Sequence, residues 1–238
     1  MKALILNSGL GRRMGALTEK APKCMTQIAG GETIISRQIR QLKNCGVNDI
    51  VVTTGPFADI LERHILSVGG DMNVSFVNNA VYDKTNYIYS IFLAKDLLRD
   101  DIILLHGDLV FDETVLRDML QCDTSRIAVS SAVPLPEKDF KAVISSDRVV
   151  KVGIEFFDNA LAAQPLYCLK KKDWLVWLAA IEQYVEDGKV TCYAENALNT
   201  VSHSCEIYIY DTCLRLCSEI DTPEDLEKNN AMIEKERE

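Results

Sequence analysis

The chain has 238 residues, of which 47% are hydrophobic and 26% charged, a length that suits one or two globular domains. Its apolar runs are shorter than the roughly 18 to 20 residues of a membrane helix, and no signal-peptide pattern opens the chain, which favours a cytoplasmic protein without membrane insertion. A net charge of −9 opposes a general nucleic-acid-binding surface.

The first half of the chain alternates strand patterns with helical patterns. In chain order the expected elements are a strand at 2–7, a helix through Ile35, Ile39 and Leu42 that ends at Gly46, a strand at 49–54, a helix at 58–68, a strand at 73–78, a helix at 87–98 and a strand at 101–105. Apolar strands separated by helices predict an α/β fold with a doubly wound, mostly parallel sheet.

The second half has a different pattern, with shorter and more closely spaced strands. We expect strands at 126–133, 141–145, 149–154 and 162–169 and a helix at 173–185. Because no linker separates the halves, we expect one domain, 1–238, with an N-terminal portion (1–125) and a β-richer C-terminal extension (126–238). Thr222-Pro223-Glu224-Asp225 is a helix start, which puts Asp221 just ahead of a helix.

A basic, glycine-rich loop follows the first expected strand. Residues 6–15 read LNSGLGRRMG, and Ala21-Pro22-Lys23 follows shortly after. Glycines let backbone N–H groups approach phosphate oxygens, while arginine and lysine neutralise the charge on a leaving pyrophosphate. The P-loop motif is absent, and Met14 breaks the dinucleotide-binding motif. We therefore interpret the loop as a polyphosphate cradle of another type; a tight turn with solvated arginines is the alternative.

These residues resemble the signature of the nucleotidyltransferase superfamily, which reads roughly GxGxRxxPxTxxxPK. The matching positions are Gly9, Gly11, Arg13, Thr18, Pro22 and Lys23, while Ala16 stands at the internal proline. Segments 85–90 and 219–222, and the short length, are most similar to bacterial CTP:phosphocholine cytidylyltransferases and their phosphonate-activating relatives. The resemblance implies a Rossmann-like, three-layer α/β/α fold in which 1–125 binds the nucleotide and 126–238 binds the acceptor.

A magnesium site is expected where Asp108 follows an apolar strand. In open α/β sheets ligands bind outside the carboxyl ends of strands, and Mg²⁺ prefers carboxylate and phosphate oxygens. The resemblance implies that Asp108 and Asp221 hold Mg²⁺ and that Arg13, Lys23 and Asp108 are catalytic. The alternatives are a turn-forming acid at Asp108 and a residue that merely precedes an N-cap at Asp221. Asp112 is better explained as a turn or helix-capping residue than as a metal ligand.

The nucleotide-binding residues implied by the loop and by the resemblance lie in three segments. They are Leu6, Asn7, Ser8, Gly9, Gly11, Arg12, Asn86, Ser90 and Gly107. For Asn86 and Ser90, at the start of a helix, a capping role is the alternative. His106 is a candidate to contact a ligand, whereas His64 and His203 show no partner for catalysis.

The acceptor site is expected near Tyr193 and Glu195. An aromatic ring and an acid can hold a cationic head group together, and this segment is similar to the one that supplies the choline-side acid in the cytidylyltransferases. Trp174 and Trp177, spaced i, i+3, are expected in the core.

The eight cysteines lie scattered between Cys24 and Cys217 in a chain large enough to bury its own core, so we expect them to be reduced. Cys213 and Cys217 have no second pair at zinc-site spacing.

The function favoured by the sequence is a Mg²⁺-dependent cytidylyltransferase. It would transfer CMP from CTP to phosphocholine or a related amino-alcohol phosphate or phosphonate and release pyrophosphate. The alternatives are a sugar-1-phosphate nucleotidylyltransferase and a non-catalytic, nucleotide-binding regulatory relative. The expected partners are these small molecules rather than nucleic acid, and the sequence leaves the choice between a monomer and a homodimer open.

Overall fold

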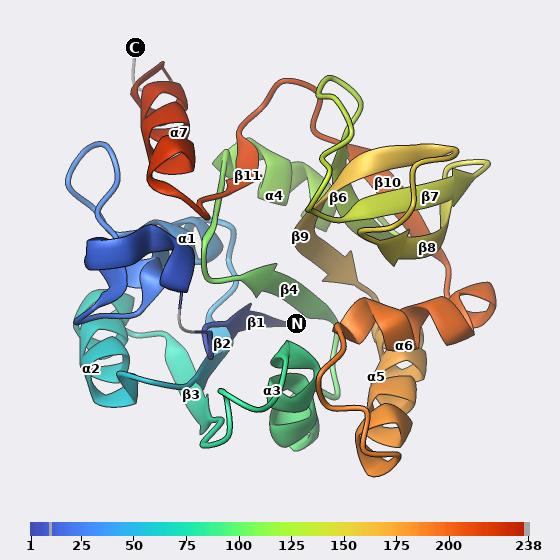
Figure 1. Cartoon of the computed structure of the whole chain (residues 1–238), viewed down its shortest axis with the longest axis horizontal. Coiled ribbons are helices and arrows are strands. Elements are labelled where there is room, and N and C mark those ends of the chain that lie inside the picture. Colours follow the sequence, from blue (N-terminus) through green and yellow to red (C-terminus); the bar gives the residue numbers. More distant parts are fainter. Residues whose placement is uncertain (10, 236–238) are drawn as a thin grey trace.

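The computed structural model describes residues 1–9 and 11–235, which fold around a nine-stranded sheet of strand order β3-β2-β1-β4-β9-β6-β10-β8-β7 (Figure 1). The strands are β1 (Lys2–Leu6), β2 (Asp49–Thr54), β3 (Asn73–Asn78), β4 (Ile102–His106), β5 (Leu109–Phe111), β6 (Ser125–Ser130), β7 (Lys141–Ser145), β8 (Arg148–Gly153), β9 (Ala160–Leu169), β10 (Ile207–Asp211) and β11 (Cys217–Glu219). The helices are α1 (Ile34–Asn44), α2 (Ala58–Gly69), α3 (Tyr87–Ala94), α4 (Glu113–Leu120), α5 (Lys171–Glu186), α6 (Ala194–Val201) and α7 (Pro223–Lys235), with short 3₁₀ segments η1 (Arg12–Thr18), η2 (Lys23–Met25), η3 (Lys95–Leu97) and η4 (Ser202–Ser204).

The N-terminal half of the sheet is parallel. β1 pairs in parallel with β2 on one side and β4 on the other, so that Leu4 lies opposite Val51 and Leu104, and β2 pairs in parallel with β3. The crossover connections bring the carboxyl ends of all four strands to one edge of the sheet. The predicted order of alternating strands and helices is confirmed in this half of the chain.

The prediction of a mostly parallel sheet is wrong for the C-terminal half. β9 runs antiparallel to both β4 and β6, β8 runs antiparallel to β10, and β7 runs antiparallel to β8 and β9. Among the described residues of this half, only β6 and β10 pair in parallel. The physical reason is the connection length. β7 and β8 are joined by Ser146 and Asp147 alone, both with positive φ (51° and 63°), and so short a turn can join only antiparallel neighbours.

Helices cover both faces of the sheet, in two separate hydrophobic clusters. One cluster joins α3, α5 and α6 to one face and includes Trp174 and Trp177, which are fully buried as predicted. The other joins α1, α2 and α4 to the opposite face through residues such as Ile39 and Ile65. The two tryptophan indoles donate to the carbonyls of Leu98 (2.7 Å) and Ala194 (2.9 Å), which satisfies their buried N–H groups.

A third apolar cluster fastens the C-terminal helix to the N-terminal segments. Ile233 of α7 packs with Met14 and Ile34, and Figure 1 shows α7 standing beside the segments at the start of the chain. The predicted helix start is confirmed: the Asp225 amide donates to Thr222 Oγ1 (3.2 Å), and the Thr222 amide donates to Asp225 Oδ2 (2.9 Å). The β5–β11 pair, which places Glu219 opposite Leu109, brings Asp221 next to the end of β4.

Several elements escaped prediction, notably α4, α6, β10 and the β5–β11 pair. Asp112 does cap a helix, since its side chain accepts from the Thr114 amide at the start of α4. All eight cysteines are free, and Cys24, Cys168, Cys205 and Cys217 are buried. Among the residues that the structure describes, no helix combines the length and apolar character needed to cross a bilayer.

Candidate active site

A pocket of about 350 Å³ lies at the carboxyl ends of the parallel strands, between the glycine-rich loop and the start of α3. The residues predicted to bind nucleotide, catalyse or hold metal all line it, while Tyr193 and Glu195 do not. Its described lining consists of Leu6, Asn7, Ser8, Gly9, Gly11, Arg12, Arg13, Pro22, Lys23, Cys24, Asn79, Tyr82, Thr85, Asn86, Tyr87, Ser90, His106, Gly107, Asp108 and Asp221.

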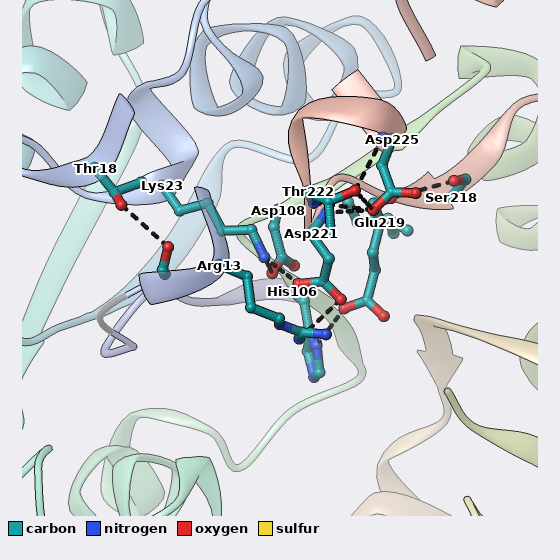
Figure 2. Close-up of polar contacts among 12 residues, drawn as sticks. Arg13, Thr18, Lys23, His106, Asp108, Ser218, Glu219, Asp221, Thr222 and Asp225 are labelled. Atoms are coloured by element: carbon teal, nitrogen blue, oxygen red, sulfur yellow. Dashed lines mark hydrogen bonds and ion pairs between the residues drawn. The ribbon is translucent and has the colours of Figure 1, made fainter. Parts of the chain in front are cut away.

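A cluster of opposite charges occupies one end of the pocket. The Lys23 ammonium donates to Asp108 Oδ2 (2.6 Å) and also to Asp221 Oδ1, and Arg13 Nη2 lies 2.9 Å from Asp221 Oδ2. Figure 2 shows Lys23 and Arg13 reaching from the N-terminal segments toward Asp221. Lys23 and Asp221 are 198 positions apart in the sequence. They meet because α7, which follows Asp221, packs on the N-terminal segments.

The turn that carries Asp108 is held by neighbouring elements. The buried Gln38 side chain on α1 donates to the carbonyls of His106 (2.9 Å) and Leu109 (2.7 Å), on either side of Asp108. The Ile220 amide donates to the Asp108 carbonyl (2.9 Å), which fixes the adjoining chain. The two carboxylates are therefore set by secondary structure rather than by a free loop.

The electrostatics of this cluster favour the charged forms of Lys23 and Asp108. Burial lowers the pKa of Lys23, but the charges of Asp108 and Asp221 outweigh it and raise the pKa above its ordinary value. Burial raises the pKa of Asp108, yet the charge of Lys23, and then that of His106, outweighs burial and lowers it. Lys23 is therefore a stable ammonium, and Asp108 a stable carboxylate, near neutral pH.

Another part of the pocket has a polar wall, built where β1, β2 and α3 meet. Ser8 Oγ lies 2.7 Å from Ser90 Oγ and 3.1 Å from Thr53 Oγ1, and the Asn79 amide nitrogen donates to Ser90 (3.0 Å). Asn86 both lines the pocket and caps α3, accepting from the Tyr87 amide (2.7 Å). The capping role expected as an alternative for Asn86 is thus present together with its place in the pocket lining.

Gly107 is required by a close approach between strand ends. A Cβ atom on Gly107 would lie 1.7 Å from Asn7 Oδ1, and the Gly107 amide donates to the Leu6 carbonyl (3.0 Å). Any larger residue would push Asn7 from the pocket. The side-chain amide nitrogen of Asn7 is buried and has no hydrogen-bond partner among the described residues, whereas the backbone amide of Asn7 donates to Thr53 Oγ1 (3.1 Å).

The donor set around Asp108 fits a divalent cation. Asp108 Oδ1 is buried without a hydrogen-bond partner among the described residues, and Asp108 and Asp221 both contact the Lys23 ammonium, so the two carboxylates are close together. His106, Asp108 and Glu219 also offer ligand atoms within 4.8 Å of one another. Carboxylate oxygens are the ligands that Mg²⁺ prefers.

His106 and Tyr87 line the pocket and contact residues of the C-terminal half, Glu219 and Glu195 respectively. His106 Nδ1 lies 3.0 Å from Glu219 Oε1, and its ring meets that of Tyr87 edge-on at 4.9 Å between centroids. Burial lowers the pKa of His106, but its hydrogen bond to Glu219 and the charge of that carboxylate outweigh burial and raise the pKa to about 9. Burial, and then the charge of Asp108, raises the pKa of Glu219 to about 7, so His106 and Glu219 are a closely coupled buried pair.

The predicted acceptor residues lie behind the pocket wall. Glu195 is 1% exposed and accepts from the hydroxyls of Tyr87 and Tyr167, the latter at 2.9 Å. Tyr193, at the N-terminus of α6, lies 5.9 Å from the Tyr87 ring and 5.0 Å from the Phe140 ring. His64 lies elsewhere, 2.8 Å from Ser36 Oγ, and His203 also lies outside the pocket.

Three residues that line the pocket were not expected there from the sequence: Asn79, Tyr82 and Tyr87. Asn79 directly follows β3, so the rule that ligands bind at strand carboxyl ends could have found it. Tyr87 lies within a segment that carries the family resemblance, but its apolar neighbours gave no sign that it lines the pocket.

Comparison with known proteins defines the class to which this fold and site belong. Residues 3–198 match the MobA-like NTP transferase domain family, and the chain belongs to that family. The resemblance to nucleotidyltransferases seen in the glycine-rich loop is therefore confirmed.

Individual relatives include two curated cytidylyltransferases. CTP:phosphoglutamine cytidylyltransferase of Campylobacter jejuni is 32% identical over 126 residues, 50% of this chain, and the alignment spans 48% of that relative. Choline-phosphate cytidylyltransferase of Streptococcus pneumoniae is 23% identical over 99% of this chain and 100% of its own length. The solved CTP:phosphocholine cytidylyltransferase from Streptococcus pneumoniae has the same fold, with a TM-score of 0.80 at 21% identity over 98% of each chain.

Proposed function

We propose that the protein is a Mg²⁺-dependent cytidylyltransferase that transfers CMP from CTP to an amino-alcohol phosphate or phosphonate, such as phosphocholine. The observation that carries the proposal is the cluster in which Lys23 meets Asp108 and Asp221 beside Arg13 and the glycine-rich loop. A purely regulatory nucleotide-binding module has no need of two carboxylates and two cations at the phosphate end of the pocket.

The reaction requires one bond to form and one to break. A phosphate or phosphonate oxygen of the acceptor attacks the α-phosphorus of CTP in line, and the bond from that phosphorus to the oxygen bridging to the β-phosphate breaks. Pyrophosphate leaves with the electron pair. The attacking oxygen is already ionised near neutral pH, so no general base is needed and catalysis consists of positioning and charge stabilisation.

Each part of the chain has a defined task in this reaction. Gly9 and Gly11 let backbone N–H groups approach the triphosphate, while Arg13 and Lys23 stabilise the charge that develops on pyrophosphate. Mg²⁺ held by Asp108 and Asp221 would neutralise phosphate charge when bound. Asn7, Ser8, Asn86 and Ser90 line the same pocket and are the residues we assign to the nucleoside.

The names of the two curated relatives support the choice of nucleotide and acceptor class. One is named for CTP and phosphoglutamine and the other for choline phosphate. Both acceptors combine a phosphate with a nitrogen-containing group. In this chain Tyr87 lines the pocket and would form its acceptor side, with Tyr193 and Glu195 in contact with Tyr87 outside the lining.

The test is pyrophosphate release from each of the four NTPs, with and without Mg²⁺, in the presence of phosphocholine, 2-aminoethylphosphonate, phosphoethanolamine or glucose 1-phosphate. We expect release from CTP with a nitrogen-containing acceptor and only with the metal. Turnover of glucose 1-phosphate alone would favour a sugar-phosphate enzyme. The absence of turnover in every combination would contradict the proposal.

A further inference from the structure

Tyr87 connects the pocket to a buried carboxylate. It is the first residue of α3, it lines the pocket, and its hydroxyl donates to Glu195 Oε2. The other carboxylate oxygen of Glu195 accepts from the Tyr167 hydroxyl (2.9 Å). Because both oxygens are engaged and the residue is 1% exposed, Glu195 is held in place behind Tyr87 rather than presented to a ligand.

The surroundings of Tyr87 fix the orientation of its ring. His106 meets it at 4.9 Å and 64°, and Tyr193 lies on another side at 5.9 Å, itself supported by Phe140. Burial, and then the charge of Glu195, raises the pKa of the Tyr87 phenol well above its usual range. The hydroxyl therefore stays protonated and keeps donating to Glu195.

This arrangement suits recognition of a cation. An aromatic face attracts a positive charge, and a phenol that donates its proton to a carboxylate carries more electron density in its ring. The His106 ring meets the Tyr87 ring edge-on, and His106 Nδ1 lies 3.0 Å from Glu219 Oε1, so the Glu219 side chain holds His106 in place beside Tyr87. Tyr87 also lines the same pocket as Asp108 and Asp221, where the phosphate of the acceptor would bind.

We propose that Tyr87 is the residue that recognises a positively charged amino or ammonium head group on the acceptor, and that Glu195 is a positioning residue that acts through Tyr87. The inference rests on the proposed function and deepens it. It assigns charge selectivity to a pocket-lining ring rather than to direct contact between the acceptor and a carboxylate.

The experiment compares acceptors that differ only in charge. Suitable pairs are phosphocholine with 3,3-dimethylbutyl phosphate, phosphoethanolamine with propyl phosphate, and 2-aminoethylphosphonate with propylphosphonate. The measured quantity is the ratio of kcat/KM for the charged acceptor to that for its neutral counterpart, together with KM for CTP. The variants are Tyr87→Leu, Tyr87→Phe, Glu195→Gln and the double variant Tyr87→Leu/Glu195→Gln.

We call the ratio of kcat/KM for the charged acceptor to that for its neutral counterpart the charge preference. We expect Tyr87→Leu to lower the charge preference by about 2- to 30-fold and to leave KM for CTP within about twofold of the wild-type value. Tyr87→Phe keeps the ring but loses the bond to Glu195, so it should behave like Glu195→Gln, with a smaller loss. Adding Glu195→Gln to Tyr87→Leu should change the preference no further. Tyr89→Leu is the matched control, since Tyr89 stacks on Phe92 of the same helix and is not among the described pocket residues.

Three results would overturn the inference, and they are distinguishable. An unchanged preference in Tyr87→Leu, in an enzyme that still uses CTP, contradicts the role of Tyr87 but not the proposed function. A further loss from Glu195→Gln in the Tyr87→Leu background would mean that Glu195 contacts the acceptor itself. A wild-type protein that uses only glucose 1-phosphate, or releases no pyrophosphate, overturns the proposed function and this inference with it. Circular dichroism and thermal unfolding of each variant separate these effects from misfolding.

Discussion

Lys23 balances two carboxylates that would otherwise repel each other across the phosphate end of the pocket. Its side chain is 12% exposed, and those of Asp108 and Asp221 are 21% and 15% exposed. Charges that are partly removed from water interact more strongly than charges on the surface. The same three groups are the ones that would meet the phosphates of a nucleotide, so charge balance within the protein and catalysis depend on the same residues.

Lys23→Ala should lower turnover with CTP at least about tenfold, because the loss of one charged contact to a transition state typically costs about 2 to 4 kcal/mol. The ion pairs imply that stability falls too, by about 2 kcal/mol, more than a lysine in a loop suggests from sequence alone. Steady-state kinetics and urea unfolding measure the two effects. The exposed Lys20→Ala is the control, and a Lys23→Ala enzyme with normal kcat and KM for CTP would remove Lys23 from the mechanism.

Asp108→Asn and Asp221→Asn should each abolish activity at limiting Mg²⁺ while leaving the circular dichroism spectrum unchanged. The amide preserves the shape of the side chain but loses the charge that holds a hard cation. Asp112→Asn is a matched control, because asparagine caps a helix as well as aspartate does at the start of α4. Activity near wild type in either site variant, measured across a Mg²⁺ titration, would contradict the two-carboxylate site.

The elements that could be predicted are those whose local sequence, such as an apolar run or a set of capping residues, agrees with the structure that the segment adopts in the fold. β2, β3 and β7 coincide with the expected strands, and the start of α7 follows its capping residues. β10 and the β5–β11 pair could not be placed, because pairing across long sequence distances is set by tertiary contacts. For the same reason the glycine-rich loop and Asp108 were accessible from sequence, whereas the contact between Tyr87 and Glu195 was not.

Gly107→Ala tests how the ends of β1 and β4 approach each other. The added Cβ would lie 1.7 Å from Asn7 Oδ1, so Asn7 must move, and we expect a loss of about 1 to 3 kcal/mol in stability and a raised KM for CTP. Gly69→Ala in α2 is the comparison, since its Cβ would meet nothing closer than 3.9 Å. It should leave stability equal or higher. Equal thermal unfolding temperatures for the two variants would contradict this account.

At the scale of the whole molecule, one continuous sheet joins two halves of different construction. The parallel strands β1 to β4 collect their loops at one edge, where the glycine-rich loop and Asp108 lie. The antiparallel strands extend the same sheet through β9, and the chain then returns so that α7 packs against the N-terminal segments. The candidate site therefore depends on both ends of the chain being folded together.

The burial of the cysteines allows the integrity of this whole fold to be measured. Burial raises the pKa of the thiols of Cys24 and Cys217, raises that of Cys168 to about 12, and raises that of Cys205 to about 11. At pH 8 these thiols are almost entirely protonated as well as inaccessible, and thiols in that state react slowly.

With a thiol-specific disulfide reagent at pH 8, we therefore expect the exposed Cys213 to react rapidly and the four buried cysteines to react only after unfolding in denaturant. Mass spectrometry of the labelled peptides identifies the sites, and Cys213→Ser should remove the rapid phase. If the fold is held together across both halves, the buried thiols, which lie in segments from Cys24 to Cys217, should become reactive over the same range of denaturant. Rapid native labelling of Cys24 or Cys217, or separate transitions for these two residues, would show that the N-terminal segments and β11 open independently.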